Sequence, residues 1–132
     1  MSVIKILKSY RNVAMVGVSA DPAKPSNIVF RYLSEHGYNV IPVNPTISGE
    51  VLGKKCYASL TDIPEKVEVV DIFRRSEDIV PIVEEAIKIG AKAVWMQEGV
   101  VNEEAADKAR KAGLKVVMDR CMAKEHLRLH AE

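Results

Sequence analysis

Apolar residues gather in five short runs along the chain, each bounded by glycine, proline or polar residues. The runs cover residues 13–18, 38–45, 67–73, 91–96 and 114–119. The first, VAMVGV, is apolar at every position, which is typical of a strand buried on both faces of a parallel sheet. The second contains two prolines, which limit its length as a strand. We therefore predict five strands.

Segments with helical periodicity alternate with these runs. Helices are expected from Ser26 or Asn27 to about His36, from Ser76 to about Ile89, from Asn102 to the glycine at 113, and over 122–130. The first three of these helices begin at good N-cap residues, and glycines follow them as stop signals. Pro81 falls in the first turns of the second helix, where a missing N–H is tolerated best.

Two further segments complete the predicted elements. The N-terminal MSVIKILKSY indicates a short amphipathic helix with Val3, Ile4 and Leu7 on one side. Residues 46–66 are rich in turn residues and predict a loop with a short extended piece near Cys56 and Tyr57 and one helical turn. With strands and helices alternating throughout, we expect an α/β fold, an open and mostly parallel five-stranded sheet with helices on both faces. The 132 residues fit a single domain.

Composition narrows the class of protein without identifying a function. Hydrophobic residues make up 48% of the chain, and 19 basic against 18 acidic residues leave a net charge of +1. This balance gives no electrostatic reason to expect nucleic acid or an acidic membrane surface as a partner. No apolar run approaches the ~20 residues of a membrane span, and no secretory signal is visible. Two separated cysteines indicate a cytoplasmic protein with reduced thiols, and the scarcity of glutamine favours a thermophilic source.

The loop after the first strand is the first candidate for chemistry. Open α/β sheets bind ligands at the carboxyl ends of their strands, and this loop leads into a helix whose N-terminus favours anions. Gly17 allows a tight turn, Ser19 offers a hydroxyl and Lys24 a positive charge. The dinucleotide pattern G-x-G-x-x-G keeps only its first glycine here, so the motif by itself is weak.

The end of the second strand separates the candidate nucleotides. NAD-dependent enzymes usually place an acid there to bind the ribose hydroxyls, whereas this chain has Val43, Asn44 and Pro45. The missing acid argues against NAD and tolerates a phosphorylated ribose. NADP stays an alternative, although no obvious arginine follows Asn44. Coenzyme A, whose ADP part carries a 3′-phosphate, fits as well or better.

Six phrases in order resemble one known family. They are VGVSADPAKPSN, GYNVIPVNP, VLGKKCYASLTDIP, VVDIFRRSED, AVWMQEGVVNEEA and GLKVVMDRCMAKEH. Together they resemble the stand-alone CoA-binding domain proteins, small relatives of the N-terminal domain of the succinyl-CoA synthetase α subunit. The resemblance spans about residues 10–130 and implies a Rossmann-like fold that binds coenzyme A.

The resemblance also implies site residues, in four groups along the chain. The diphosphate would lie against Gly17, Val18, Ser19 and Ala20, with Lys24 neutralising phosphate. The adenosine part would lie beside Val43, Asn44 and Pro45, and the nucleotide would be bordered by Phe73 and Arg74. The pantetheine arm would run beside Met96, Gln97 and Glu98. The phosphorylated histidine of the synthetase lies in a second domain that this chain lacks. CoA or acyl-CoA binding therefore carries over, and the ligase activity does not.

The leading prediction is thus a non-enzymatic CoA or acyl-CoA module, acting alone, as a homo-oligomer or beside a partner subunit. An NAD(P)-dependent oxidoreductase and a thiol-redox protein using Cys121 or Cys56 remain alternatives, as does an interaction module without nucleotide. Cys121 is expected to be a buried thiol, and Cys56 is a candidate for a mixed disulfide with the CoA thiol.

We expect the remaining candidate residues to have structural rather than functional roles, with Arg75 left open. His126 and His130 share one side of the last helix, which we expect to be frayed and solvated, and two histidines make a poor zinc site. Trp95 is expected in the core, and Arg75 stays an open candidate beside Arg74. The acids, Asp71 among them, form no visible pair for acid–base catalysis.

Overall fold

The computed structural model describes residues 2–130. Its strands are β1 (Asn12–Val16), β2 (Asn39–Val43), β3 (Glu50–Val51), β4 (Lys54–Lys55), β5 (Val69–Ile72), β6 (Ala93–Met96) and β7 (Lys115–Val117). Its helices are α1 (Ser2–Ser9), α2 (Pro25–Glu35), α3 (Ile79–Lys88), α4 (Glu103–Lys111) and α5 (Met122–Leu129), with 3-10 turns η1 (Leu60–Asp62) and η2 (Ser76–Asp78).

Within these residues the main sheet has five strands in the order β2-β1-β5-β6-β7, and every neighbouring pair is parallel. The α/β class and the open parallel sheet are thereby confirmed. The chain leaves β1 toward one edge of the sheet and returns at β5 on the other side of β1. The sheet therefore has a switch point between β1 and β5, and α/β folds bind ligands at the carboxyl ends of such strands.

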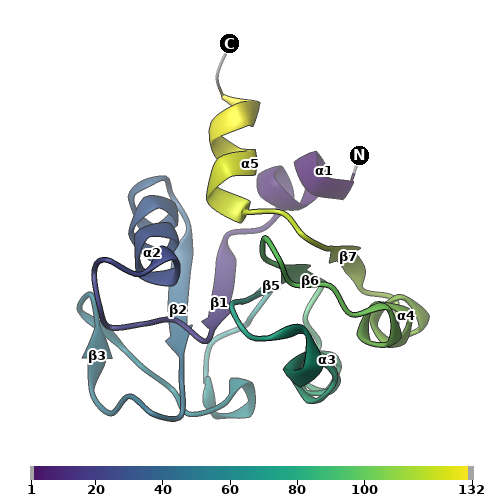
Figure 1. Cartoon of the computed structure of the whole chain (residues 1–132), viewed down its shortest axis with the longest axis horizontal. Coiled ribbons are helices and arrows are strands. Elements are labelled where there is room, and N and C mark those ends of the chain that lie inside the picture. Colours follow the sequence, from purple (N-terminus) through teal and green to yellow (C-terminus); the bar gives the residue numbers. More distant parts are fainter. Residues whose placement is uncertain (1, 131–132) are drawn as a thin grey trace.

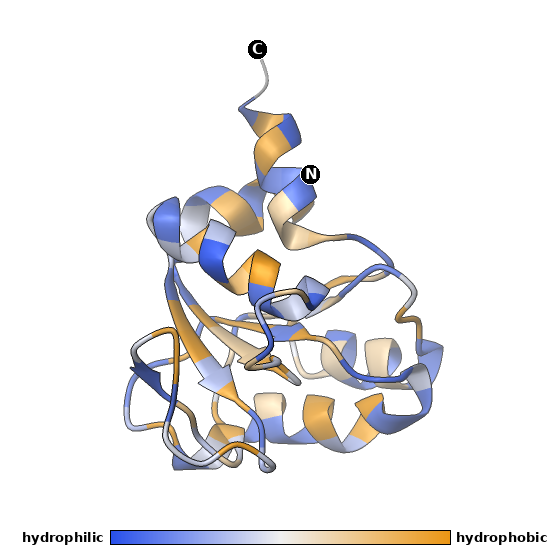
Figure 2. Ribbon diagram, turned by 60° about the vertical axis from the view of Figure 1, so that its left-hand side comes forward, coloured by the Kyte–Doolittle hydropathy of each residue, from blue (hydrophilic) through white to orange (hydrophobic). Residues whose placement is uncertain are grey.

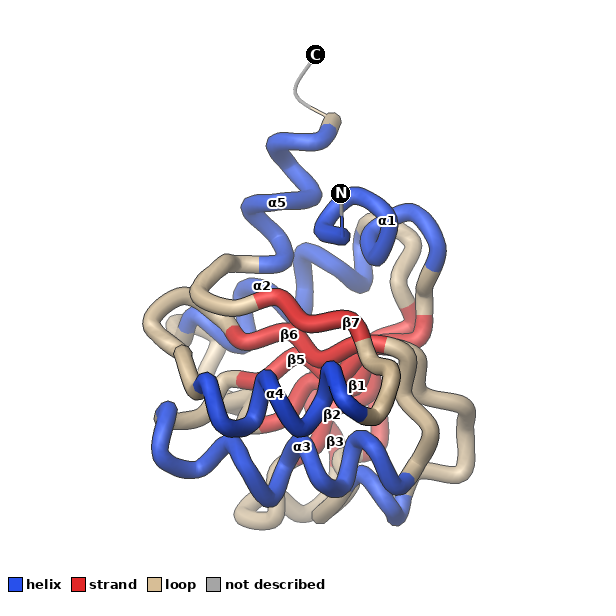
Figure 3. The backbone as a smooth tube through the Cα atoms, turned by 90° about the vertical axis from the view of Figure 1, so that its right-hand side faces the viewer, coloured by secondary structure: helices blue, strands red, loops and turns tan. Residues whose placement is uncertain are grey.

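Helices cover both faces of the sheet. Figure 1 shows α1, α2 and α5 on one face and α3 and α4 on the other, and Figure 3 shows the strands edge-on between these two layers. Alternate residues of each strand pack into separate cores, so Val13 and Met15 contribute to the α2 side and Ala14 and Val16 to the α3 side. Figure 2 shows the hydrophobic residues gathered along these two interfaces.

The strands are shorter than the apolar runs that predict them. The first run continues to residue 18, but β1 ends at Val16 because Gly17 turns the chain with φ of +87°. Trp95, expected in the core, is fully buried in β6. In α1 the buried side chains are Ile6 and Leu7, whereas Ile4 is 40% exposed, so the predicted apolar side is rotated.

The start of α2 differs from the prediction of a Ser26 or Asn27 cap. Lys24 is the N-cap, with extended backbone, and Pro25 takes the first helical position, where its fixed φ fits and no N–H is needed. Ser26 and Asn27 turn inward instead. The Ser26 hydroxyl oxygen accepts from the Ser19 amide at 2.8 Å, and the Asn27 side-chain amide donates to the Ser19 carbonyl at 2.9 Å.

One other predicted boundary shifts. Ser76 begins the turn η2, and α3 starts at Ile79, which puts Pro81 at the third position of the helix. Asn102 caps α4 as predicted, because its side-chain oxygen accepts from the Ala105 amide at 2.9 Å. Residues 46–66 contain the predicted helical turn as η1, and also a small antiparallel hairpin of β3 and β4 that the sequence pattern missed.

The last helix is not a frayed, solvated one. His126 is buried, and its Nδ1 lies 2.8 Å from the Tyr32 hydroxyl of α2. The rings of His36 and His130 lie 5.4 Å and 4.5 Å from the His126 ring, so His126 and His130 do share one side of the helix. Within residues 2–130 no cluster of three His, Cys, Asp or Glu side chains could ligate a metal, and no helix could span a membrane.

Candidate functional site

The switch point is built around Gly17, directly after β1. A Cβ atom at Gly17 would lie 2.3 Å from the Phe73 carbonyl oxygen and 2.8 Å from Cδ of Arg74. Its φ of +87° is also a conformation that residues with side chains rarely adopt. A glycine is therefore required for the loop after β1 to lie against the end of β5.

Hydrogen bonds fix the neighbouring loops to one another. The Gly17 amide donates to the Val43 carbonyl at 2.9 Å, and the Asn44 side-chain amide donates to the Val18 carbonyl at 2.9 Å. The side-chain oxygen of Asn44 accepts from the Thr46 amide and hydroxyl. Asn44 thus joins the loop after β2 to the loop after β1, and its amide is already engaged within the protein.

The loop from Gly17 to α2 keeps several free donors. Among residues 2–130, the amide nitrogens of Val18, Ala20 and Ser26 donate to no other protein atom. The Ser19 hydroxyl oxygen accepts from the Asp21 amide, which leaves its O–H able to donate outward. Lys24 is exposed at the start of α2. Free amides, a helix N-terminus and a lysine together favour an anionic group at this loop.

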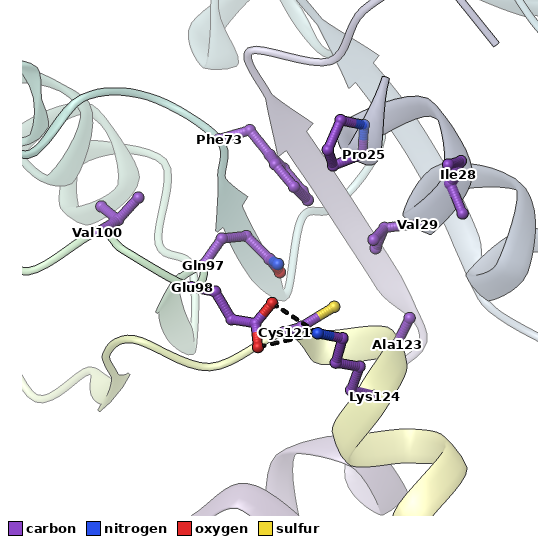
Figure 4. Close-up of a pocket in the computed structure, with 10 residues that line it drawn as sticks. All are labelled: Pro25, Ile28, Val29, Phe73, Gln97, Glu98, Val100, Cys121, Ala123 and Lys124. Atoms are coloured by element: carbon purple, nitrogen blue, oxygen red, sulfur yellow. Dashed lines mark hydrogen bonds and ion pairs between the residues drawn. The ribbon is translucent and has the colours of Figure 1, made fainter. Parts of the chain in front are cut away.

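A pocket of about 580 Å³ lies on the α2 side of this loop, between the first turns of α2 and α5. We call it the α2–α5 pocket. Its lining residues are Pro25, Ile28, Val29, Phe73, Gln97, Glu98, Val100, Cys121, Ala123 and Lys124. Figure 4 shows these side chains converging from α2, α5 and the ends of β5 and β6. Most of the lining is apolar, so the pocket suits a thin, largely uncharged group.

Polar groups in the α2–α5 pocket are few. The side chain of Gln97 is buried, and its oxygen accepts from the Met122 amide at 3.2 Å, which caps α5. Its amide nitrogen forms no hydrogen bond within the described chain, so one donor remains for a ligand. At the rim, Lys124 Nζ lies 3.0 Å from a Glu98 carboxylate oxygen, and this bond raises the pKa of Lys124.

A second pocket of about 310 Å³ lies on the opposite side of Gly17, against α3. We call it the α3 pocket. Val43, Pro45 and Arg74 line it together with residues 58–59 and the first turns of α3. The Arg74 guanidinium lies 3.5 Å from the Asp78 carboxylate, so its charge is partly engaged. Glu77 and Glu85 also line this pocket, which makes it more acidic than the α2–α5 pocket.

The predicted site residues therefore divide between two pockets and the loop that separates them. Phe73, Gln97 and Glu98 line the α2–α5 pocket, and Val43, Pro45 and Arg74 line the α3 pocket. Asn44, Val18 and Met96 line neither pocket, and the amide of Asn44 is engaged within the protein. Val18 is fully buried in the core on the α2 side and Met96 in the core on the α3 side, so only their backbone can meet a ligand.

Sequence reasoning missed the contribution of α5. Cys121, Ala123 and Lys124 line the α2–α5 pocket, although the sequence analysis placed no CoA-binding residue beyond Glu98 and named Cys121 only for the thiol-redox alternative. The sequence did contain a signal that Cys121 could line a site. Cys121 follows the last predicted strand and so lies at its carboxyl end, where α/β folds bind ligands. The α2 residues Ile28 and Val29 were read only as helix.

Asp71 is a buried acid in β5, beside this site. It pairs in register with Met15 of β1 and Trp95 of β6 on the α2 side of the sheet. It is fully buried, and neither carboxylate oxygen has a hydrogen-bond partner in the described chain. Burial raises the pKa of Asp71 well above its usual value, because the charged form is poorly solvated. The carboxyl is therefore most stable as the neutral acid.

The site fits an elongated ligand with a charged middle. An anionic group can lie on the loop at Gly17, one end can enter the apolar α2–α5 pocket, and the other can enter the α3 pocket. A nucleotide diphosphate with an uncharged arm has this distribution of charge.

Comparisons with known proteins give the family context. A profile of a family described as a CoA binding domain matches residues 11–127. The uncharacterized protein YneT of Bacillus subtilis is 39% identical over 122 residues, which cover 92% of this chain and 90% of YneT. A solved structure of a hypothetical protein from Pyrococcus horikoshii OT3 is 52% identical, with a TM-score of 0.93 over 96% of this chain and 89% of that one.

A longer relative is an enzyme subunit. The alpha subunit of ADP-forming acetate–CoA ligase I from Pyrococcus furiosus is 29% identical over 131 residues. The match covers 86% of this chain and 28% of the subunit, so this chain corresponds to about a quarter of that protein.

Proposed function

The chain belongs to the CoA-binding domain family, and from this premise we propose that it binds coenzyme A or an acyl-CoA as one domain without catalysing a reaction of its own. The observation that carries the proposal is the close approach at Gly17, where a Cβ would overlap the Phe73 carbonyl at 2.3 Å. That approach holds the loop after β1 against the end of β5, with a pocket on either side.

In the proposed complex the diphosphate lies over Gly17, Ser19 and Ala20. The free amide of Ala20 and the Ser19 hydroxyl donate to it, and Lys24 supplies positive charge. This assignment uses the helix N-terminus in the way that α/β folds commonly bind phosphates. Lys24 forms no ion pair within residues 2–130, so no internal partner competes for it.

The two ends of coenzyme A differ in polarity, and so do the pockets. The pantetheine arm is uncharged along its length, its terminal thiol included, which matches the apolar walls of the α2–α5 pocket. Its amide carbonyls can accept from the free Gln97 amide nitrogen. The adenosine part would lie beside Val43 and Pro45 in the α3 pocket, where Arg74 can meet the 3′-phosphate once it leaves Asp78.

Absence of catalysis rests on the comparison between short and long relatives. YneT carries no catalytic name, and the ligase subunit named as an enzyme is several times longer than this chain. The proposed role is therefore to bind CoA, alone, as a homo-oligomer or beside a partner subunit. A cytoplasmic location and a thermophilic source stay predictions.

Titration calorimetry with CoA, dephospho-CoA and NADH at one salt concentration tests the proposal. We expect CoA to bind with a Kd of about 1 μM or tighter, which corresponds to about −8 kcal/mol. Dephospho-CoA should bind more weakly, and NADH should give no heat of binding. No binding of CoA would reject the proposal, whereas tight NADH binding would favour an NAD-dependent enzyme.

A matched pair of lysine variants locates the diphosphate. Lys24→Ala should weaken CoA binding about 3- to 10-fold, because a charge-assisted contact to phosphate is lost. Lys111→Ala is the control, since Lys111 is the exposed last residue of α4, at the opposite end of the sheet. Equal affinities for both variants would exclude Lys24 from the site.

A further inference from the structure

Cys121 lies at the inner end of the α2–α5 pocket. It joins β7 to α5 as the N-cap residue of that helix, and only 6% of the residue is exposed. It nevertheless lines the pocket, and Figure 4 shows its sulfur directed toward the space beside Val29 and Ala123. The thiol can therefore be reached from the pocket and is otherwise covered by protein.

A second polar group points to a ligand at the same place. Gln97 is only 4% exposed, yet its amide nitrogen forms no hydrogen bond in the described chain, while its oxygen is engaged by Met122. This nitrogen is open to the pocket rather than fully buried, so an acceptor inside the pocket can replace water as its partner. An amide carbonyl a short distance before a terminal thiol would meet both Gln97 and Cys121.

The distribution of charge around the α2–α5 pocket indicates which class of thiol-bearing ligand it can bind. Its walls at Ile28, Val29 and Phe73 are apolar, and the charged pair of Glu98 and Lys124 is satisfied internally at the rim. A charged small thiol such as glutathione would lose solvation there without gaining a partner. An uncharged amide arm that ends in a thiol meets no such penalty.

We propose that Cys121 forms a mixed disulfide with coenzyme A held in the α2–α5 pocket. This inference rests on the proposed function and adds a covalent form of the complex. The Cys121 thiolate attacks one sulfur of CoA disulfide, the S–S bond of that co-reactant breaks, and a new Cys121–CoA disulfide forms. One CoA leaves as the thiolate and takes up the proton that Cys121 has released, so no other oxidant is needed.

Position at a helix N-terminus suits Cys121 for this exchange. The attacking species is the thiolate, and negative charge is favoured at the positive end of the helix dipole. The Ala123 and Lys124 amides of α5 donate to no protein atom in the described chain, so they are free to face a sulfur anion or the departing thiolate.

Cys56, the sequence-based candidate for this mixed disulfide, has a different environment. It precedes Tyr57 in the loop after β4, and its Sγ lies 3.7 Å from the Asn44 carbonyl oxygen. Burial raises the pKa of Cys56, which disfavours its thiolate. Cys56 does not line the α2–α5 pocket. The structure therefore transfers the proposed disulfide from Cys56 to Cys121, and Cys56 becomes the internal control.

The test is exposure of the reduced protein to CoA disulfide, followed by intact mass and peptide mapping under non-reducing conditions. We expect one CoA adduct, mapped to Cys121 in the wild type and removed by dithiothreitol. The adduct should persist in Cys56→Ser and disappear in Cys121→Ser. Glutathione disulfide should react at least about tenfold more slowly, the factor that corresponds to 1.4 kcal/mol of specific binding.

Calorimetric titration of the same samples with CoA separates the disulfide proposal from the proposal that the chain binds CoA. If CoA binds and no adduct forms, or if the adduct maps to Cys56, the disulfide is rejected and the CoA-binding function stands. If CoA does not bind reversibly and both disulfides react at the same rate, the proposed function fails as well. Mapping on the wild type decides the site even if a serine variant folds poorly.

Discussion

Gly17 is the residue on which the geometry of the switch point depends most directly. Two independent constraints act on it, a positive φ of +87° and a Cβ position that overlaps the Phe73 carbonyl. The sequence pattern identified Gly17 from its place after an apolar run, but it gave no indication of the contact with β5. That contact joins residues 56 positions apart, and only the folded sheet brings them together.

Gly17→Ala should lower the free energy of unfolding by about 3 kcal/mol or more, because backbone strain and overlap with a carbonyl both add cost. Gly37→Ala is the matched control, since Gly37 has φ of +92° and open space around its Cβ position. It should cost about 1 kcal/mol through strain alone. Urea denaturation measures both losses, and equal values would contradict the close contact at Gly17.

Buried polar residues depart most from the sequence interpretation. Asp71 was one of several scattered acids, and the structure places it fully buried without a partner. Because its folded pKa is raised above its unfolded value, Asp71 stabilises the fold at low pH. This contribution is lost as the pH rises from about 4, where the unfolded state releases its proton, toward the folded pKa.

The pairing of α2 with α5 is the contact between helices that shapes the main pocket. Their first turns line the α2–α5 pocket, and farther along them Tyr32 and His126 are joined by the 2.8 Å hydrogen bond. Burial lowers the pKa of His126, and the positive charges of His130, His36 and Arg11 lower it further. Neutral His126 therefore stabilises the contact above the unfolded pKa near 6.5, and this stability is lost as the pH falls below it.

His126→Asn should reduce the loss of unfolding free energy between pH 7 and pH 5, since the substitute keeps an acceptor near the Nδ1 position but cannot ionise. Tyr32→Phe is the comparison, because it removes the hydrogen bond and leaves His126 titratable. It should cost about 1 kcal/mol at pH 7 and retain the pH dependence. The titration of Asp71 changes the free energy of unfolding with pH in the opposite direction, and it contributes equally to both variants. Identical pH profiles for wild type and His126→Asn would exclude His126 as the source.

At the level of the entire protein, ligand binding and folding are linked. A ligand that binds the folded chain alone stabilises it by about 2.7 kcal/mol at a hundredfold excess over its Kd. For a chain of this length that corresponds to a rise in Tm of roughly 6 to 12 °C. We expect this rise with CoA, a smaller one with dephospho-CoA at the same concentration, and none with NADH. The Tm follows from scanning calorimetry, and equal shifts for CoA and NADH would contradict the proposed specificity.

Local patterns in the sequence sufficed for the architecture of this protein. Buried apolar runs, N-caps such as Asn102 and helix-stopping glycines act over a few residues, so the alternation of strands and helices and the parallel sheet could be predicted correctly. The six family phrases carried the expectation of CoA binding, and the matching family profile agrees with it. Even so, the Lys24 cap of α2 and the β3–β4 hairpin were missed, although Pro25 at the first helical position and Gly53 in the two-residue turn are themselves local signals.

The pockets, by contrast, depend on contacts between residues far apart in the chain. Cys121 lines one pocket with Val29 and Phe73, Asp71 is fully buried within the sheet, and His126 packs against Tyr32 only once α5 lies on α2. No local pattern encodes such neighbours, since burial and partners arise when separate elements pack. The sequence alone thus determined the sheet and the end of it at which a ligand should bind, while packing determined which side chains face that ligand.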